Sequence, residues 1–342
     1  MLGGMRIGPG ARAWVVAMAL ALAACSSDAS TTPSPSLPDA SGSDARPTGD
    51  GGGGAAEAPA ALPAPAVGVG ACTEVTYTPP GAPTPQEGEL CRPPADVDAR
   101  DVGVVLLHGG SGTAGRWSDL DGWVDAYLGA GITTLNVDYE LFRPGREDDA
   151  VFPRPEQDVK AAVQYLRGVA PALGVEEDRI VVHGTSSGAR IGAVAFTTPD
   201  DPSFAGPELW SGISDRVDGF VGFYHPYDGS LQGAATYYGG ERDDEDTDVR
   251  RRWYLADALM HAEDATGPAA FFTGERDWEV QITQAQELAA VLEEHGHDAS
   301  VTVVARAGHG FDLSGGGLTK AGQQVAYVVT QWLEQQFPPA GR

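Results

Sequence analysis

The sequence predicts an α/β fold in which helices cover a mostly parallel sheet. Short, nearly continuous apolar runs alternate with helical patterns along the chain, as parallel strands joined by crossover helices require. Glycine, histidine, serine and aspartate cluster where these runs end. In open parallel sheets, ligands bind at the carboxyl ends of the strands. We therefore expect a functional site at that edge of the sheet.

Five apolar runs are the predicted strands. They span Val102–Leu107, Ile132–Val137, Arg179–Val182, Ala269–Phe272 and Val301–Val304. A helix is predicted over Ala189–Phe196, because small and apolar residues there suit close packing on a sheet.

The first 66 residues are predicted to lie outside the folded domain. Arg6 and Arg12 precede an apolar stretch that is too short to span a bilayer and is typical of an export signal. The stretch ends in Leu22-Ala23-Ala24-Cys25, which resembles the lipobox of bacterial lipoproteins. This resemblance implies a signal peptide over residues 1–24, lipidation of Cys25, export, and anchoring to a bacterial membrane. The alternative is an ordinary secretory signal with Cys25 downstream of the cut.

Residues 25–66 are predicted to form a flexible tether, because Ser, Thr, Pro, Gly, Ala and Asp dominate and cannot bury a core. The remaining residues, 67–342, form the predicted α/β domain. Within it, residues 228–266 are predicted to be a small insertion that caps the site. The acidic stretch Glu241–Asp248 lacks a recognisable calcium-ligand spacing and is interpreted as a solvated loop.

Composition and charge exclude several classes of partner. Charged residues make up 20% and hydrophobic residues 42% of the chain, which is typical of a globular enzyme. The formal net charge of −26 repels phosphate backbones and anionic headgroups. We therefore predict no nucleic-acid partner and contact with a membrane only through the lipid anchor. No metal or cofactor is predicted, and the oligomeric state is not determined by the sequence.

Two cysteines remain beyond the lipobox. Cys72 and Cys91 flank a turn that contains Pro79-Pro80-Gly81, and an exported compartment permits disulfides. We predict a bridged β-hairpin that leads into the sheet. Two free buried thiols are the alternative.

A candidate nucleophile follows the third predicted strand. Gly184-Thr185-Ser186-Ser187-Gly188 matches the G-x-S-x-G pattern, a strained turn between a strand and a helix that exposes the central serine. The spacing of the glycines favours Ser186 over Ser187 as the nucleophile. A glycine-rich structural turn is the remaining alternative, because so short a pattern also occurs by chance.

A serine hydroxyl needs a base that takes its proton and an acid that orients the base. His309, in Ala307-Gly308-His309-Gly310-Phe311, follows a predicted strand and is the candidate base. Asp277 follows another strand and lies between the serine and the histidine in the chain, so it is the candidate acid. Glu275 is its competitor.

Nucleophilic attack on an ester carbonyl creates a negative oxygen that preorganised N–H groups must stabilise. The backbone of Gly109, Gly110 and Ser111, after the first predicted strand, and the N–H of Ser187 are the candidate donors of this oxyanion hole. His108 is interpreted as a structural residue that holds the loop. Trp117 and Trp123 either line an acyl pocket or pack in the core.

These motifs, taken in order, resemble those of the α/β-hydrolase superfamily, and the likeness covers about Val102–Phe337. They are most similar to the hormone-sensitive-lipase-like and BD-type feruloyl esterase branch. The resemblance is carried by Asp138-Tyr139-Glu140-Leu141, Phe152-Pro153 and Asp158-Val159-Lys160-Ala161-Ala162-Val163, and by the acid and histidine regions. Two departures are Ser111, where the branch usually has a third glycine, and Ser187-Gly188-Ala189, where it often has Ala-Gly-Gly.

The resemblance implies an α/β-hydrolase fold with a cap-like insertion and a cofactor-free serine hydrolase. Such an enzyme cleaves carboxylic esters through an acyl-enzyme, and the expected substrates are small or polymer-borne acyl esters, including acylated polysaccharides. Two alternatives remain open. One is a peptidase or depolymerase with the same triad, and the other is an inactive surface lipoprotein that serves as a binding module.

Overall fold

The computed structural model describes residues 62–63, 65–143, 151–227 and 234–339. All of them belong to one compact unit, Pro59–Arg342. The predicted signal peptide, Cys25 and nearly all of the predicted tether lie outside the described residues. Within the described ranges, no helix combines the length and the apolar composition that crossing a membrane requires.

Among the described residues, eight strands form one sheet in the order β1-β2-β4-β3-β5-β6-β7-β8. Strand β2 pairs antiparallel with both β1 and β4, and every other neighbouring pair is parallel. The strands are β1 Cys72–Thr76, β2 Glu87–Cys91, β3 Gly103–Leu107, β4 Thr133–Val137, β5 Ile180–Thr185, β6 Gly219–Phe223, β7 Ala269–Gly274 and β8 Ala299–Val304. A separate hairpin consists of β9 Leu313–Ser314 and β10 Gly317–Leu318.

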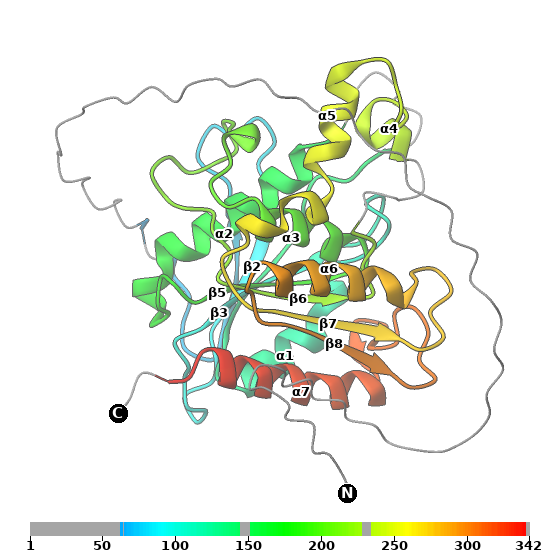
Figure 1. The fold of residues 1–342 in the computed structure, drawn as a ribbon. Helices are drawn as coiled ribbons and strands as arrows, with labels where there is room; N and C mark the ends of the chain where they lie inside the picture. The colour runs from blue at the N-terminus through cyan, green and yellow to red at the C-terminus, as the bar shows by residue number, and fades with distance from the viewer. Residues whose placement is uncertain (1–61, 64, 144–150, 228–233, 340–342) are drawn as a thin grey trace, which may run out of the picture. The chain divides into compact units, whose positions relative to one another are not determined.

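Helices cover both faces of this sheet (Figure 1). Helices α2, α3 and α6 lie on one face, and α1 and α7 lie on the other. The α-helices are α1 Asp121–Gly129, α2 Arg154–Leu173, α3 Ser187–Thr197, α4 Ala234–Tyr238, α5 Thr247–Leu255, α6 Ile282–Glu294 and α7 Lys320–Gln336. Short 3-10 helices span Trp117–Leu120, Pro202–Phe204 and Ala258–Asp264.

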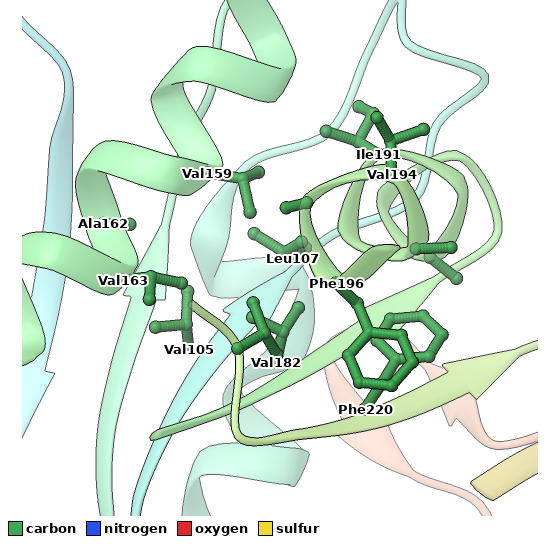
Figure 2. Packing of buried hydrophobic residues seen from close by; sticks show 14 of the residues in the cluster. Val105, Leu107, Val159, Ala162, Val163, Val182, Ile191, Val194, Phe196 and Phe220 are labelled. Atoms are coloured by element: carbon green, nitrogen blue, oxygen red, sulfur yellow. The ribbon is translucent and has the colours of Figure 1, made fainter. Parts of the chain in front are cut away.

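The two helical layers explain why the predicted strands are continuous apolar runs. On β3, Val105 and Leu107 belong to the core beneath α2 and α3, whereas Val104 and Leu106 belong to the core beneath α1 and α7. A strand buried on both faces needs apolar residues at every position. Figure 2 shows the first of these cores, where side chains of α2 and α3 pack against β3, β5 and β6.

The predicted fold class is confirmed, and the five predicted strands are β3, β4, β5, β7 and β8. Strand β6 is absent from the prediction. Its sequence, Gly-Phe-Val-Gly-Phe, carries two glycines in five positions, and glycine is unfavourable in strands. Tertiary pairing with β5 and β7 stabilises it nonetheless.

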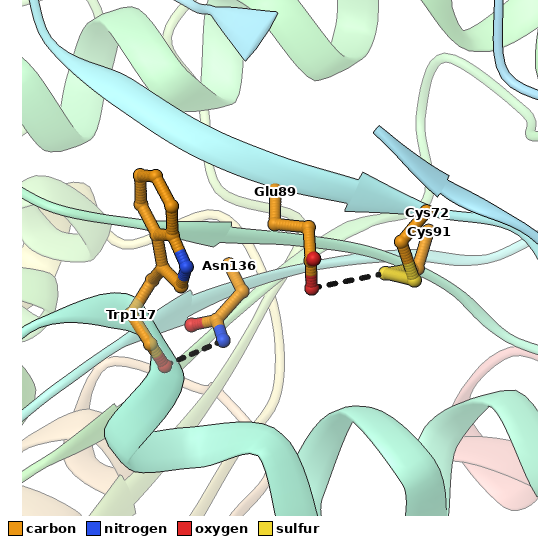
Figure 3. The surroundings of a disulfide bond; sticks show 5 residues. All are labelled: Cys72, Glu89, Cys91, Trp117 and Asn136. Carbon is orange, nitrogen blue, oxygen red and sulfur yellow. Dashed lines mark hydrogen bonds between the residues drawn. A yellow bond between two sulfur atoms is a disulfide. The ribbon is translucent and has the colours of Figure 1, made fainter. Parts of the chain in front are cut away.

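The predicted disulfide is also confirmed. Cys72 and Cys91 face each other across the β1–β2 ladder and are joined by a bond between residues 19 positions apart. The carboxylate of Glu89 lies beside this bridge, with its Oε2 atom 3.4 Å from Sγ of Cys91 (Figure 3). The bridge ties the outermost strand to β2 and thus to the sheet.

The described part of the predicted insertion, residues 234–266, holds α4, α5 and a 3-10 helix. A buried ion pair connects it to the rest of the fold. Arg190 of α3 lies 3.3 Å from the Glu156 carboxylate of α2, and the Tyr237 and Tyr238 hydroxyls of α4 contact this pair at 3.1 and 3.2 Å. In the acidic stretch, the Asp246 side chain accepts a hydrogen bond from the Asp248 N–H and caps α5.

His225 is an unusual buried residue near the end of β6. It is 1% exposed, and its ring stacks on Phe271 with 5.2 Å between ring centroids. Neither ring nitrogen has a hydrogen-bond partner among the described residues. Burial lowers the pKa of His225 to about 3, compared with 6.5 for an unperturbed histidine. The folded protein therefore holds this imidazole in the neutral form at ordinary pH.

We predict that His225 destabilises the fold in acid. Between about pH 6.5 and pH 3 the unfolded chain binds a proton that the folded chain does not, so the unfolding free energy falls as the pH falls. In urea unfolding series from pH 6 to pH 4, His225→Phe should make this dependence shallower by about 1.4 kcal/mol per pH unit. His295→Gln, which changes an exposed histidine, should leave the slope unchanged. Equal slopes for wild type and His225→Phe would contradict the prediction.

Candidate active site

Ser186 occupies the tight turn between β5 and α3. Its backbone has a φ of 49° and a ψ of −121°, a conformation that non-glycine residues rarely adopt. The turn packs closely against the end of β3, because a Cβ atom on Gly188 would lie 2.4 Å from the carbonyl oxygen of His108. The sequence pattern therefore folds as the predicted strand, strained turn and helix.

His309 lies in the loop after β8 and faces this serine. Its Nε2 atom is 3.0 Å from Oγ of Ser186, and its Nδ1 atom is 2.9 Å from Oδ2 of Asp277. The side chain is 18% exposed, so the imidazole borders solvent. When Nδ1–H donates to Asp277, the lone pair of Nε2 is left to accept the proton of Ser186.

Asp277 is held by the loop after β7. Its side chain is fully buried, and its Oδ1 atom accepts hydrogen bonds from the N–H groups of Glu279 and Val280, both at 2.9 Å. These bonds leave Oδ2 for the imidazole. The competing carboxylate, Glu275, accepts a hydrogen bond from the N–H of Arg306 and does not contact His309. The structure thus brings together Ser186, His309 and Asp277.

The glycine-rich loop after β3 lies beside the serine. A Cβ atom on Gly109 would be 3.2 Å from Cβ of Ser186. Gly110 has a φ of 119°, and its carbonyl accepts hydrogen bonds from the N–H groups of Thr113 and Ala114. Ser111 has a φ of 55° and is exposed. Ser187, the first residue of α3, directly follows Ser186. The four residues predicted to form the oxyanion hole therefore lie next to Ser186 in the chain or in this loop.

His108 holds this loop, as its predicted structural role requires. The side chain is 1% exposed, and Nδ1 lies 2.7 Å from the carbonyl oxygen of Gly109. Its ring stacks on Tyr139 at 4.4 Å, and the Tyr139 hydroxyl donates to the His108 carbonyl. Burial lowers the pKa of His108, which favours the neutral imidazole.

The segment after β4, which contributes Tyr139 to the contacts of this loop, is held by two further hydrogen bonds. The Asp138 carboxylate accepts a hydrogen bond from the N–H of Trp117, and Asp158 accepts one from the N–H of Glu140. Figure 3 shows the carbonyl of Trp117, which accepts a hydrogen bond from the Asn136 amide. These contacts give Asp138 and Asp158 of the sequence motifs a structural role.

The question of the two tryptophans is settled for Trp123, which packs in the core. It is fully buried, and its Nε1–H donates to the Asp312 carboxylate at 2.7 Å. The other oxygen of Asp312 accepts from the Tyr224 hydroxyl at 2.6 Å, and the Tyr224 ring lies 4.6 Å from the His309 ring. Neither Tyr224 nor Asp312 is among the residues predicted from the sequence. Their only signals were a position after an unrecognised strand and a position close to His309 in the chain.

The carboxylate of Glu279 lies close to His309. Oε2 of Glu279 lies 4.0 Å from Nε2 of His309, and this side chain is 50% exposed. Trp278, its neighbour, is 84% exposed. An imidazolium at His309 would therefore be attracted to Glu279 as well as to Asp277, although solvent screens the exposed carboxylate.

A polar pocket of about 480 Å³ lies next to the oxyanion loop. Its lining includes His108, Thr113 and Gly115 of that loop and Asp138 and Tyr139 of the supporting segment. None of Ser186, Asp277 and His309 lines it. The pocket is therefore separate from the hydrogen-bonded chain of Ser186, His309 and Asp277.

Two curated proteins match parts of the chain. Esterase LipC of Mycobacterium tuberculosis is 34% identical over 98 residues, which cover 29% of this chain and 23% of that esterase. The 2-hydroxy-6-oxononadienedioate/2-hydroxy-6-oxononatrienedioate hydrolase of Paraburkholderia phymatum is 36% identical over 101 residues, or 30% of this chain and 33% of that hydrolase. The chain thus matches a third or less of the length of each relative.

Solved structures of an esterase resemble the whole domain. The apo form of Thermogutta terrifontis esterase 2 has a TM-score of 0.64 and 21% identity, and the match covers 84% of this chain and 98% of the esterase. The propionate-bound form of the same esterase has a TM-score of 0.64 and 21% identity, and covers 79% and 97%. At this level of identity the likeness establishes a shared fold.

The sequence profile of the BD-FAE family matches residues 92–292, which is more than half of the chain. The match runs from the end of β2 into α6, so it includes the Ser186 turn and the Asp277 loop. With the mostly parallel sheet and the esterase-like fold, this match shows that the chain belongs to the BD-FAE family of α/β-hydrolases.

Proposed function

We propose that this chain is a serine carboxylesterase in which Ser186 is the nucleophile, His309 the general base and Asp277 the orienting acid. One observation carries the proposal. Three side chains from separate loops form a continuous chain of contacts, with 3.0 Å from serine Oγ to histidine Nε2 and 2.9 Å from Nδ1 to the carboxylate. A serine in this arrangement can lose its proton as it attacks a carbonyl carbon.

In the proposed first half-reaction, Oγ of Ser186 attacks the ester carbonyl while its proton moves to Nε2 of His309. The carbonyl oxygen becomes negative, and the N–H of Ser187 and those of the loop at Gly109, Gly110 and Ser111 stabilise it. The imidazolium then gives the proton to the departing alcohol oxygen, and an acyl group remains on Ser186. In the second half-reaction, a water molecule attacks the carbonyl carbon of the acyl group while its proton moves to Nε2 of His309. The imidazolium returns this proton to Oγ of Ser186, and the carboxylic acid leaves.

The relatives support an esterase with modest acyl groups. Family membership and the matched segment of an esterase favour ester hydrolysis. The Thermogutta esterase, whose fold this chain shares, has been solved with propionate and with butyrate bound. We therefore propose short acyl esters, free or attached to a polymer, as substrates. The Glu279 carboxylate, 4.0 Å from Nε2, disfavours substrates that carry a negative charge near the scissile bond.

Removal of a triad member should abolish turnover. Ser186→Ala should lower kcat on nitrophenyl acetate or butyrate by about 10⁴-fold or more, because it removes the nucleophile. Asp277→Asn should lower kcat by about 10⁴-fold, because the carboxylate that fixes the tautomer of His309 and stabilises the imidazolium is lost. Glu275→Gln, in the same loop but bonded to Arg306, should retain activity.

A fluorophosphonate probe followed by peptide mapping tests the same assignment without a substrate. The probe should label Ser186 in the folded protein. A folded protein without an adduct on Ser186 would rule out the enzyme, and an adduct without turnover of any ester would favour the peptidase alternative.

The oxyanion loop should be sensitive at one glycine and tolerant at another. A Cβ atom at Gly110, where φ is 119°, would lie 2.1 Å from the carbonyl oxygen of Ala114. Gly110→Ala should therefore displace the loop and lower kcat by about 10²-fold, the loss typical of one oxyanion donor. Gly112→Ala is the matched control, because Gly112 also has a positive φ, of 69°, and so carries a comparable backbone strain, but a Cβ atom there meets nothing within 4 Å. Equal kinetics for the two variants would exclude the loop from the oxyanion site.

We further propose that the domain acts outside the cytoplasm on a lipid anchor at Cys25. The lipobox-like Leu22-Ala23-Ala24-Cys25 supports this proposal, as does a disulfide of the kind that oxidising compartments permit. In a bacterial host, the full chain should incorporate labelled palmitate and sediment with membranes. Cys25→Ser should abolish both properties and leave the esterase activity intact. Labelling of the Cys25→Ser variant would contradict the proposal.

A further inference from the structure

The ring of Tyr224 packs against the ring of His309. Tyr224 is the first residue after β6, and its N–H donates to the Phe272 carbonyl of β7 at 2.7 Å. The ring centroids of Tyr224 and His309 are 4.6 Å apart, with planes tilted by 58°. Tyr224 has a φ of 37°, a costly conformation that persists only where the surroundings enforce it. The protein thus holds this aromatic ring in a fixed place under the general base.

Asp312 anchors that ring through the tyrosine hydroxyl. It is fully buried, three residues after His309 in the chain, and accepts the Tyr224 hydroxyl at 2.6 Å. Its second oxygen accepts Nε1–H of Trp123 at 2.7 Å. An indole N–H can only donate, and the short bond to the tyrosine is typical of an ionised acceptor. Burial raises the pKa of Asp312, and the hydrogen bonds from Tyr224 and Trp123 oppose this change.

Burial of a carboxylate costs free energy, because the charge is removed from water. A residue that only fills space in the core would not need that charge. Apolar residues of similar volume usually fill such a position with equal or better stability. Asp312 is instead placed where its charge interacts with His309, whose positive form favours the ionised carboxylate. The other ionisable groups around this imidazole are Asp277, buried on Nδ1, and Glu279, half exposed and 4.0 Å from Nε2.

We propose that Tyr224 is a positioning residue for His309 and that Asp312 acts through it. The pair keeps the imidazole in the plane in which Nε2 meets Ser186 while Nδ1 stays on Asp277. When Nε2 takes the serine proton, the new positive charge faces Asp277 directly and Asp312 across the tyrosine. This inference rests on the proposed function, because it assigns the pair to the same general base.

The test compares two buried tyrosines, each of which has a hydroxyl in contact with a buried polar side chain. Tyr224→Phe keeps the ring against His309 and removes the bond to Asp312. Tyr127→Phe is the matched control, because Tyr127 is also fully buried and its hydroxyl contacts a buried histidine, His183, at 2.7 Å. Both variants lose a buried hydroxyl, which in Tyr224 contacts Asp312 and Thr185 and in Tyr127 contacts His183. Only Tyr224 packs against the general base. Asp312→Asn removes the charge at nearly constant volume.

Tyr224→Phe and Asp312→Asn should each lower kcat for nitrophenyl butyrate by about tenfold or more with KM unchanged, the effect of one lost charge-assisted hydrogen bond. Tyr127→Phe should leave kcat at the wild-type value. The low-field proton resonance of His309 Nδ1–H should shift or broaden in the first two variants and stay unchanged in the control. If Asp312→Asn does not fold, Tyr224→Phe decides the question.

Two results would overturn the inference. One is an unchanged kcat and resonance in Tyr224→Phe. The other is an equal loss of kcat in Tyr224→Phe and Tyr127→Phe with the His309 resonance intact, which would reduce the pair to a structural role. Since the resonance needs no substrate, a shift in a protein that cleaves no ester would support the positioning of His309 while the proposed function fails.

Discussion

The site depends on two backbone hydrogen bonds at the ends of the parallel strands. Each joins the first residue after one strand to the neighbouring strand. The N–H of Ser186 donates to the Phe223 carbonyl at 3.0 Å, and the N–H of Tyr224 donates to the Phe272 carbonyl at 2.7 Å. These bonds tie the turn after β5 to β6, and the turn after β6 to β7. Because parallel strands end at a common edge, the loops that carry the serine, the tyrosine, the aspartate and the histidine meet there.

The two carboxylates near His309 are buried in different ways. The Asp277 carboxylate accepts hydrogen bonds from two backbone N–H groups of its own loop. Asp312 is satisfied by the side chains of Tyr224 and Trp123, which belong to β6 and α1 regions far apart in the chain. The first arrangement is a property of one loop. The second requires segments that are distant in the chain to come together in the folded domain.

The insertion between β6 and β7 is coupled to the nucleophile through α3. Arg190 lies one turn after Ser186, and its N–H donates to the Ser186 carbonyl at 3.1 Å. Its guanidinium pairs with Glu156 and contacts the Tyr238 hydroxyl of α4. The helix that begins at the serine is therefore also the helix that holds α4. This buried cluster therefore joins α4 to the helix that begins next to the Ser186 turn.

The sequence by itself determined the α/β class, five of the strands, the disulfide partners and the candidate residues Ser186, His309 and Asp277. The strands are signalled locally by continuous apolar runs, and the candidate residues by their positions in loops that follow these strands. The disulfide partners follow from the two cysteines that remain beyond the lipobox and from the turn between them. The tertiary structure alone decided the pairing of Tyr224 with Asp312, which lie 88 positions apart, and the burial of Trp123 against the same carboxylate. Strand β6 has two glycines and a weak intrinsic preference, so its position and register exist only through its neighbours β5 and β7. A contact that depends on that register leaves no pattern in the chain, because the separation of its partners is set by packing and not by local periodicity.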